Sequence, residues 1–130
     1  MRYLNIVELI IINEMIIGKQ SQLRDVDLLE AAVLRPQSSA FGEDAYPTVA
    51  EKAGAFFHSL TRNHAFVDGN KRTATVALLV FLESNGYRVI WDEQQALEFI
   101  VLASTGTYTV EQITEWLVAS VEPIPESLVE

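Results

Sequence analysis

The chain has 130 residues, which fits a single domain because compact domains usually contain about 100 to 150 residues. Apolar residues make up 49% of it and charged residues 21%, a globular rather than a disordered or collagen-like composition. The chain has no cysteine, which excludes disulfides, zinc–thiolate sites and cysteine nucleophiles. The formal net charge of −9 disfavours general binding to DNA or RNA, because phosphate contacts come from basic patches.

The acidic charge is concentrated in the last third of the chain. Residues 1–88 contain all nine Lys and Arg residues against ten Asp and Glu, whereas residues 89–130 contain eight acidic residues and no Lys or Arg. A small anionic ligand held by a few local charges therefore remains compatible with the composition.

The N-terminal region is strongly apolar between residues 6 and 17 but does not resemble a signal peptide. Glu8, Asn13 and Glu14 interrupt it, no small-residue cleavage site follows, and it is too short to span a bilayer. We expect a core helix of a cytoplasmic protein.

The hydrophobic spacing and the capping residues predict six helices with short connections, an all-α domain with little or no β structure. The predicted helices cover residues 3–17, 28–34 (capped by Asp25 or Asp27), 47–62, 71–85, 93–104 (capped by Asp92) and 110–121 (with a Thr109–Gln112 capping box). Residues 37–45 and 63–70 read as loops. Residues 87–91 are β-prone but have no obvious partner strand.

The predicted helix over residues 71–85 is apolar almost all round, so we expect it to lie buried at the centre of the bundle. Residues 1–122 should form one domain. The two prolines at positions 123 and 125 should end the last helix, leaving residues 123–130 as a short C-terminal tail.

Residues 64–73, His-Ala-Phe-Val-Asp-Gly-Asn-Lys-Arg-Thr, combine several groups suited to phosphate chemistry. This loop leads into a helix N-terminus, whose unpaired N–H groups bind anions. Gly69 allows close backbone approach, Asn70 tolerates turn geometry, and Lys71 and Arg72 add positive charge. Asp68 is placed to hold Mg²⁺ together with phosphate oxygens, and His64 can accept a proton from an attacking hydroxyl.

Each of these residues also has an ordinary structural interpretation. His64 could be a capping or packing residue, Asp68 an N-cap, and Gly69 with Asn70 a simple turn. Lys71 and Arg72 could be solvated, but two cations in the first helical turn oppose the helix dipole. That mismatch suggests that an external anion binds there.

The segment resembles the signature of the Fic/Doc superfamily, His-Pro-Phe-x-Asp/Glu-Gly-Asn-Gly-Arg, and most of all its Doc (death-on-curing) branch. The resemblance extends over roughly residues 3–120, including Leu-Arg-Asp at 23–25, Arg-Pro at 35–36, Tyr-Pro-Thr at 46–48 and the Asn-Gly-Tyr at 85–87. It implies a compact helical Fic fold whose loop and central helix bind ATP. His64 would be the catalytic histidine and Asp68 the magnesium ligand.

The resemblance also implies that Gly69, Asn70, Lys71 and Arg72 bind the phosphates, with Arg62 as a further candidate. Arg62 could equally be a surface residue at a helix end.

Three departures from the general signature bear on the reaction. Ala65 replaces the usual proline, Lys71 replaces the second glycine, and Thr75 stands where a second arginine is expected. They match the Doc branch, which resembles a kinase in transferring the γ-phosphate. The resemblance implies a toxin that phosphorylates a Thr hydroxyl of translation elongation factor Tu and so stops translation. AMP or other nucleotidyl transfer stays open as an alternative, as does a Fic-like domain that only binds.

An inhibitory motif of the form Ser/Thr-x-x-x-Glu-Gly/Asn is not found, since Thr107 and Glu111 are followed by Gln112. Resemblance to Doc therefore implies a small antitoxin that binds in trans near the site, unless regulation is transcriptional. We expect no nucleic-acid and no membrane partner.

Overall fold

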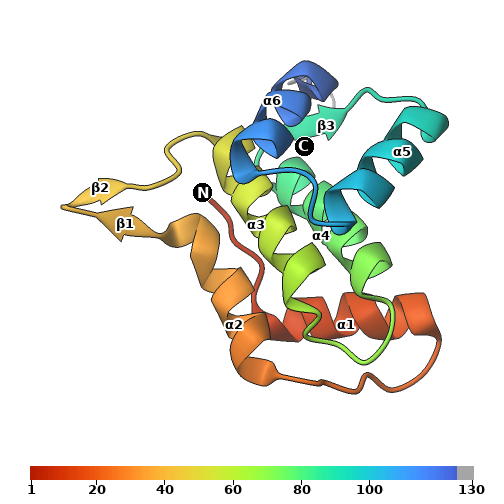
Figure 1. The fold of residues 1–130 in the computed structure, drawn as a ribbon. Helices are drawn as coiled ribbons and strands as arrows, with labels where there is room; N and C mark the ends of the chain where they lie inside the picture. Colours follow the sequence, from red (N-terminus) through yellow and green to blue (C-terminus); the bar gives the residue numbers. More distant parts are fainter. Residues whose placement is uncertain (126–130) are drawn as a thin grey trace.

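The computed structural model describes residues 1–125, apart from the side chain of Ser104, as a bundle of α-helices with short strands (Figure 1). The elements are α1 (Ile6–Ile17), α2 (Val26–Leu34), η1 (Arg35–Gln37), β1 (Ser39–Ala40), β2 (Glu43–Asp44), α3 (Val49–Asn63), α4 (Asn70–Ser84), β3 (Tyr87–Val89), α5 (Glu93–Ser104), α6 (Val110–Ser120) and β4 (Val121–Pro123). The six α-helices of this region confirm the predicted fold class.

Side-chain caps fix most helix starts. Asp25, one of two candidates, caps α2 by accepting from the N–H groups of Asp27 and Leu28, so α2 begins two residues earlier than predicted. Thr109 and Gln112 form the predicted capping box at the start of α6. Polar residues at these positions satisfy N–H groups that the helices themselves leave unpaired.

Helix α1 begins at Ile6, three residues later than predicted. Asn5 and Glu8 form a reciprocal capping box there. The prediction missed it because it followed the apolar residues, which begin before Asn5.

Two helices, α3 and α4, share the centre of the bundle, although the prediction placed only α4 there. Helix α3 packs against α2, α4, α5 and α6, and nine of its fifteen residues are buried. Gly54 shows why: a Cβ at this position would lie 2.6 Å from Thr114 Oγ1 of α6, so α6 packs closely against α3. Because small residues such as Gly54 are not strongly hydrophobic, the hydrophobicity pattern of the sequence does not reveal that α3 is buried.

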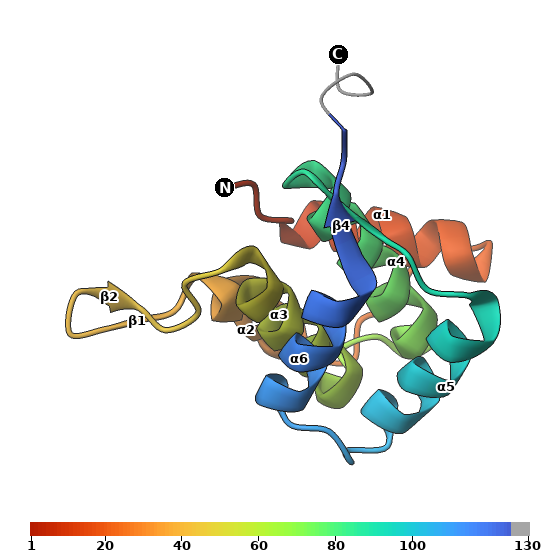
Figure 2. The ribbon, with the colours of Figure 1, turned by 90° about the horizontal axis from the view of Figure 1, so that it is seen from above.

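The residues expected to be a polar loop at 37–45 instead contain a β-hairpin, which projects from the bundle (Figures 1 and 2). Phe41 and Gly42 at its tip have φ values of 53° and 80°. Two consecutive positive φ angles are typical of the tight turns that connect such strands.

The β-prone residues at 87–89 form β3, which pairs with β4 in antiparallel register (Figure 2). Arg88 lies opposite Glu122 and forms an ion pair with it at 2.7 Å. The partner strand therefore comes from residues predicted as the end of the last helix and the start of the tail. Ile124 N–H also bonds Gly86 O at 2.8 Å, and the tail residues 126–130 lie outside the described residues.

The loop between α3 and α4 lies at one end of the bundle, beside α1 (Figure 1). Residues 22–25, which precede α2, run next to it, and Leu23 forms an isolated β-bridge with Phe66. Within residues 1–125, no helix combines the length and the apolarity needed to cross a membrane.

Candidate functional site

Backbone hydrogen bonds hold one side of the loop between α3 and α4. The N–H groups of Arg24 and Asp25 both donate to the carbonyl of Ala65, at 2.7 and 3.2 Å, and the N–H of Val67 donates to Gln22 O at 3.0 Å. The loop is thus positioned by a segment from a different part of the chain, which restricts where its side chains can point.

A buried asparagine on α1 holds the other side. Asn13 is fully buried, and its Nδ2 donates to Asp68 O at 2.8 Å and to Thr73 Oγ1 at 3.1 Å, while its Oδ1 accepts from Ser21 Oγ at 2.7 Å. A buried amide with its bonding capacity used in this way fixes the backbone of the loop. This role was not predicted from the sequence, although a lone Asn within a strongly apolar helix is a signal for it.

Asn70 shapes the loop through its side chain rather than offering that side chain to a ligand. Its Oδ1 accepts from Phe66 N–H at 3.0 Å and its Nδ2 donates to Phe66 O at 2.8 Å. The Phe66 ring is buried, so this pair ties the loop to the core. The group of Asn70 that stays available to a ligand is its backbone N–H.

Gly69 precedes α4 in the left-handed conformation, with φ of 77°. A Cβ at this position would lie 2.9 Å from Ile17 Cγ2 and 3.2 Å from Asn13 Nδ2. A glycine is needed here because of its positive φ and its packing against α1, and not only for approach to an anion.

The N-terminus of α4 has the features of an anion site. No side chain caps it, and the N–H groups of residues 70–72 donate to nothing within the described residues. Lys71 and Arg72 are exposed in this first turn, which contains no acidic residue. Arg72 lies 3.9 Å from Asp68, a pair exposed enough to be weak and exchangeable.

His64 completes the site as the residue that ends α3. It has left-handed backbone angles, φ 49° and ψ 47°, and its side chain is exposed. A pocket of about 430 Å³, here called the loop pocket, is lined by Arg24, His64, Val67, Asp68, Gly69, Asn70, Lys71 and Arg72. The structure thus brings six of the seven predicted site residues together and adds Arg24, which sequence reasoning had noted only as part of the resemblance.

Arg62, the seventh, lies in a neighbouring pocket of about 330 Å³ and donates to Tyr108 O at 2.6 Å. Arg35 and His58 line that pocket as well, with Arg35 Nη1 3.1 Å from His58 Nδ1. Burial, followed by the charges of Arg62 and Arg35, lowers the pKa of His58 from 6.5 to about 4, against a smaller opposing effect of Glu111.

Asp68 is the carboxylate available for a metal in the loop pocket. No cluster of three or more His, Cys, Asp or Glu residues suited to a metal occurs in the part of the chain that the structure describes. The donor set nevertheless fits Mg²⁺, which usually binds one or two carboxylates and completes its shell with phosphate oxygens and water.

The helical fold and the loop between α3 and α4 are typical of one class of protein, and comparison of the sequence with known protein families identifies that class. The model of the Fic/DOC family matches residues 3–82, a region that contains α1, the loop pocket and most of α4. The chain belongs to the Fic/DOC family.

Two characterised relatives are similar to this chain over most of its length. Toxin Doc of Mycolicibacterium smegmatis is 46% identical over 90 residues, which are 69% of each chain. A protein of Escherichia phage P1 named Protein kinase doc is 30% identical over 120 residues, covering 90% of this chain and 94% of its own. Both names place the similarity in the Doc branch of the family.

Proposed function

We propose that this protein is a Doc-type toxin that transfers the γ-phosphoryl group of Mg-ATP to a protein hydroxyl. By resemblance, the acceptor is a Thr of translation elongation factor Tu, and the modification stops translation in the cytoplasm. The observation that carries the proposal is the meeting of His64, Asp68 and the uncapped N-terminus of α4 in one loop pocket. The names of the two relatives support it.

The loop pocket can hold a polyphosphate through its backbone. The free N–H groups of residues 70–72 and the positive end of α4 stabilise phosphate oxygens, and Lys71 and Arg72 add two full charges beside them. Its volume of about 430 Å³ lies in the range of small-molecule sites.

His64 supplies the proton transfer. Its imidazole accepts the proton of the acceptor hydroxyl as the oxygen forms a bond to the γ-phosphorus, and the bond between that phosphorus and the β–γ bridging oxygen breaks to release ADP. Mg²⁺ held by Asp68 would supply neutralisation of the charge on the phosphates. Asp68 and Arg72 both line the pocket, and because their ion pair at 3.9 Å is weak, Asp68 can bind the cation while Arg72 binds phosphate.

The choice of the γ-phosphate depends on Lys71 and Thr75. Lys71 puts a side chain and a charge where the general Fic signature has a glycine, which crowds an α-phosphate and favours the terminal phosphates. Thr75 donates its hydroxyl to Lys71 O at 2.9 Å and so offers no cation in place of the second arginine. AMP transfer is the alternative, which the shared Gly-Asn at 69–70 keeps open.

Labelling with two isotopomers of ATP tests the reaction. Purified protein with Mg²⁺ and a bacterial lysate should transfer label from γ-labelled but not α-labelled ATP, to a protein of the size of elongation factor Tu. Label from the α position would establish nucleotidyl transfer instead. A third outcome is that neither form of ATP transfers label and that expression of His64→Ala arrests growth as strongly as expression of the parent. That outcome would support a domain that acts by binding alone.

We propose further that a small antitoxin restrains the protein in trans. The Thr107 to Glu111 segment, the nearest match to an internal inhibitory motif, lines the pocket of Arg62 rather than the loop pocket. Coexpression with its antitoxin should restore growth, and binding of the two purified proteins should be measurable by calorimetry.

A further inference from the structure

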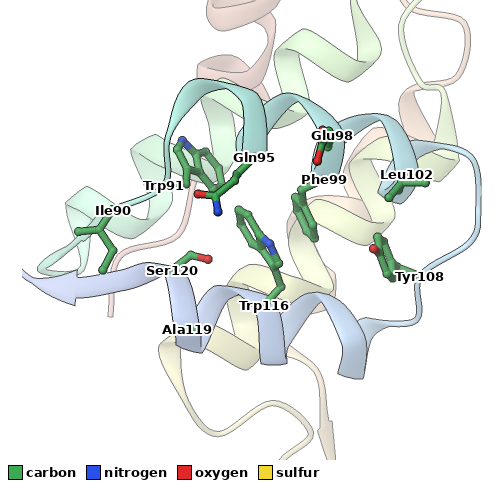
Figure 3. Close-up of a pocket in the computed structure, with 10 residues that line it drawn as sticks. All are labelled: Ile90, Trp91, Gln95, Glu98, Phe99, Leu102, Tyr108, Trp116, Ala119 and Ser120. Carbon is green, nitrogen blue, oxygen red and sulfur yellow. The ribbon is translucent and has the colours of Figure 1, made fainter.

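A second cavity lies between α5 and α6, remote in sequence from the loop pocket. It has a volume of about 380 Å³, and Figure 3 shows Phe99 and Trp116 facing each other in the space between the two helices. The residues that define it, here called the aromatic cleft, are Trp91, Gln95, Glu98, Phe99, Tyr108 and Trp116. None of them lines the loop pocket, so a role for the aromatic cleft does not depend on the proposed function.

The floor of the aromatic cleft is a continuous stack of rings. The centroids of Phe99 and Trp116 are 3.8 Å apart at an interplanar angle of 6°, and Phe99 also stacks on Tyr108 at 5.8 Å. Trp91 leans against Trp116 at 4.6 Å. Phe99 is buried, and Trp116 contacts both Phe99 and Trp91, whereas each tryptophan keeps part of its surface exposed.

The polar groups of the cleft have bonding capacity left. Neither indole N–H donates a hydrogen bond within the described residues. Glu98 accepts from Gln94 Nε2 through Oε1 at 3.2 Å and belongs to no ion pair in that part of the chain. An aromatic floor beside a carboxylate with a free oxygen is suited to a cation, because the ring faces are electronegative.

Acidic residues predominate around the cleft. No Lys or Arg follows Arg88 in the sequence, and the elements that form the cleft carry Asp92, Glu93, Glu111 and Glu115, against Arg62, which donates to Tyr108 O. Apolar side chains extend the walls, with Ile90 and Leu102 exposed to 55% and 44%. A ligand complementary to this surface is both cationic and partly apolar.

We propose that the aromatic cleft binds a basic segment of a partner protein, with an arginine side chain packed against the exposed surface of the tryptophans and its charge paired with Glu98. Arginine fits because its planar guanidinium stacks on aromatic rings and still donates to a carboxylate. The exposed Ile90 and Leu102 contact apolar neighbours of that arginine.

Intrinsic fluorescence provides a direct test, because the two tryptophans of the chain are both in the aromatic cleft. The full chain is titrated with a short synthetic peptide of alternating arginine and leucine. A second peptide carries citrulline, the uncharged isostere, at each arginine position. The arginine peptide should change the emission saturably and bind about tenfold more tightly than the citrulline peptide.

Variants of the chain test whether the peptide binds in the aromatic cleft. Glu98→Gln should lower the affinity for the arginine peptide about threefold to fivefold at an unchanged melting temperature. Glu30→Gln, which removes another exposed carboxylate, on α2, should have no effect. Trp116→Leu should remove most of the binding, with Trp91 left to report it.

Equal binding of the arginine and citrulline peptides would overturn the proposal, since the cleft would then be an apolar groove. Equal weakening by Glu98→Gln and Glu30→Gln would also overturn it, because diffuse attraction to an acidic protein would then explain the binding. The absence of any saturable change in emission would contradict it outright.

Discussion

The loop pocket and the aromatic cleft differ in what builds them. The loop pocket combines charged side chains with backbone groups: free N–H groups at the start of α4 and two residues, His64 and Gly69, with positive φ. The aromatic cleft consists of side chains, with Trp116 stacked on Phe99 at 3.8 Å. One concentrates positive charge in a small volume, and the other is formed by elements that carry more acidic than basic residues, with Arg62 bonded to Tyr108 O beside it.

This difference explains how a chain with a net charge of −9 can offer a binding site for an anion. The total charge describes the long-range field, whereas binding of a nucleotide depends on groups within a few ångström. Lys71 and Arg72 outweigh the total locally because the dipole of α4 acts with them. The acidic residues of α5 and α6 are complementary to the basic segment that we propose as a partner.

The largest effect we predict comes from removing the base in the loop pocket. His64→Ala should lower the rate of phosphoryl transfer to the target protein by about a thousandfold, within the 10² to 10⁴ range typical of general bases. Because His64 is exposed, the melting temperature should hold.

The other histidine provides the control for this experiment. His58→Gln should keep the transfer rate within about threefold of the parent, because His58 lies outside the loop pocket. A His64→Ala variant that transfers phosphate at the rate of the parent would remove His64 from the mechanism.

The second prediction concerns the support of the loop. Asn13→Leu fits the apolar interior of α1 but leaves Asp68 O, Thr73 Oγ1 and Ser21 Oγ without their partner. We expect a loss of about 3 kcal/mol in the free energy of unfolding and a melting temperature lowered by roughly 10 °C. At a temperature where the variant is folded, Mg-ATP affinity should fall as well, measured by calorimetry.

Asn85 offers a matched control at the far end of α4, since its side chain also makes three hydrogen bonds, to Arg2 and Phe81. Asn85→Leu should lose stability but keep its Mg-ATP affinity. If both variants keep that affinity, Asn13 supports the fold and not the loop pocket.

The sequence predicted most of the helices because their signals are local. Capping residues such as Asp25 and Thr109, and the apolar spacing between them, act within one or two turns. The pairing of β3 with β4 could not be found in this way, because its register depends on packing between residues more than thirty positions apart. The burial of α3 was underestimated because small residues such as Gly54 allow close helix contact without high hydrophobicity.

The same limit applies to the site. Residues 64–72 could be predicted to gather because they are contiguous, whereas Asn13 and Arg24 reach the loop only through the fold. Arg62 shows the reverse case: it is two residues from His64, but the end of α3 directs it to Tyr108 and a different pocket. The aromatic cleft also combines residues from two helices that no single pattern in the sequence connects.

The third prediction uses the pocket that contains His58 and Arg62, which is separate from the loop pocket and shares Tyr108 with the aromatic cleft. The pKa of His58 is lowered to about 4, so the unfolded chain, with a value near 6.5, binds a proton in a range where the native protein does not. Stability should therefore fall as the pH decreases from about 6.5 towards 4, with His58 contributing about 1–2 kcal/mol of the loss after allowance for solvent screening. Melting temperatures at pH 7 and pH 5 measure it.

His58→Gln isolates this contribution, because Gln can still accept from Arg35 but does not titrate. The variant should lose less stability than the parent between pH 7 and pH 5. Parallel losses in the two proteins would show that carboxylates alone account for the pH dependence.

The smallest effect on stability should come from the ion pair at the mouth of the loop pocket. The side chains of Arg72 and Asp68 are 62% and 58% exposed and 3.9 Å apart, so Arg72→Ala should change the free energy of unfolding by less than about 0.5 kcal/mol. Its Mg-ATP affinity should still fall about fivefold, because a guanidinium that is weakly paired in the free protein is available to phosphate.

Arg88→Ala is the control: Arg88 pairs with Glu122 at 2.7 Å, nearer the aromatic cleft, and its loss should affect ATP binding little. Equal losses of affinity in the two variants would mean that the nucleotide responds to the total charge of the protein, and the distinction between a local positive pocket and an acidic surface would fail.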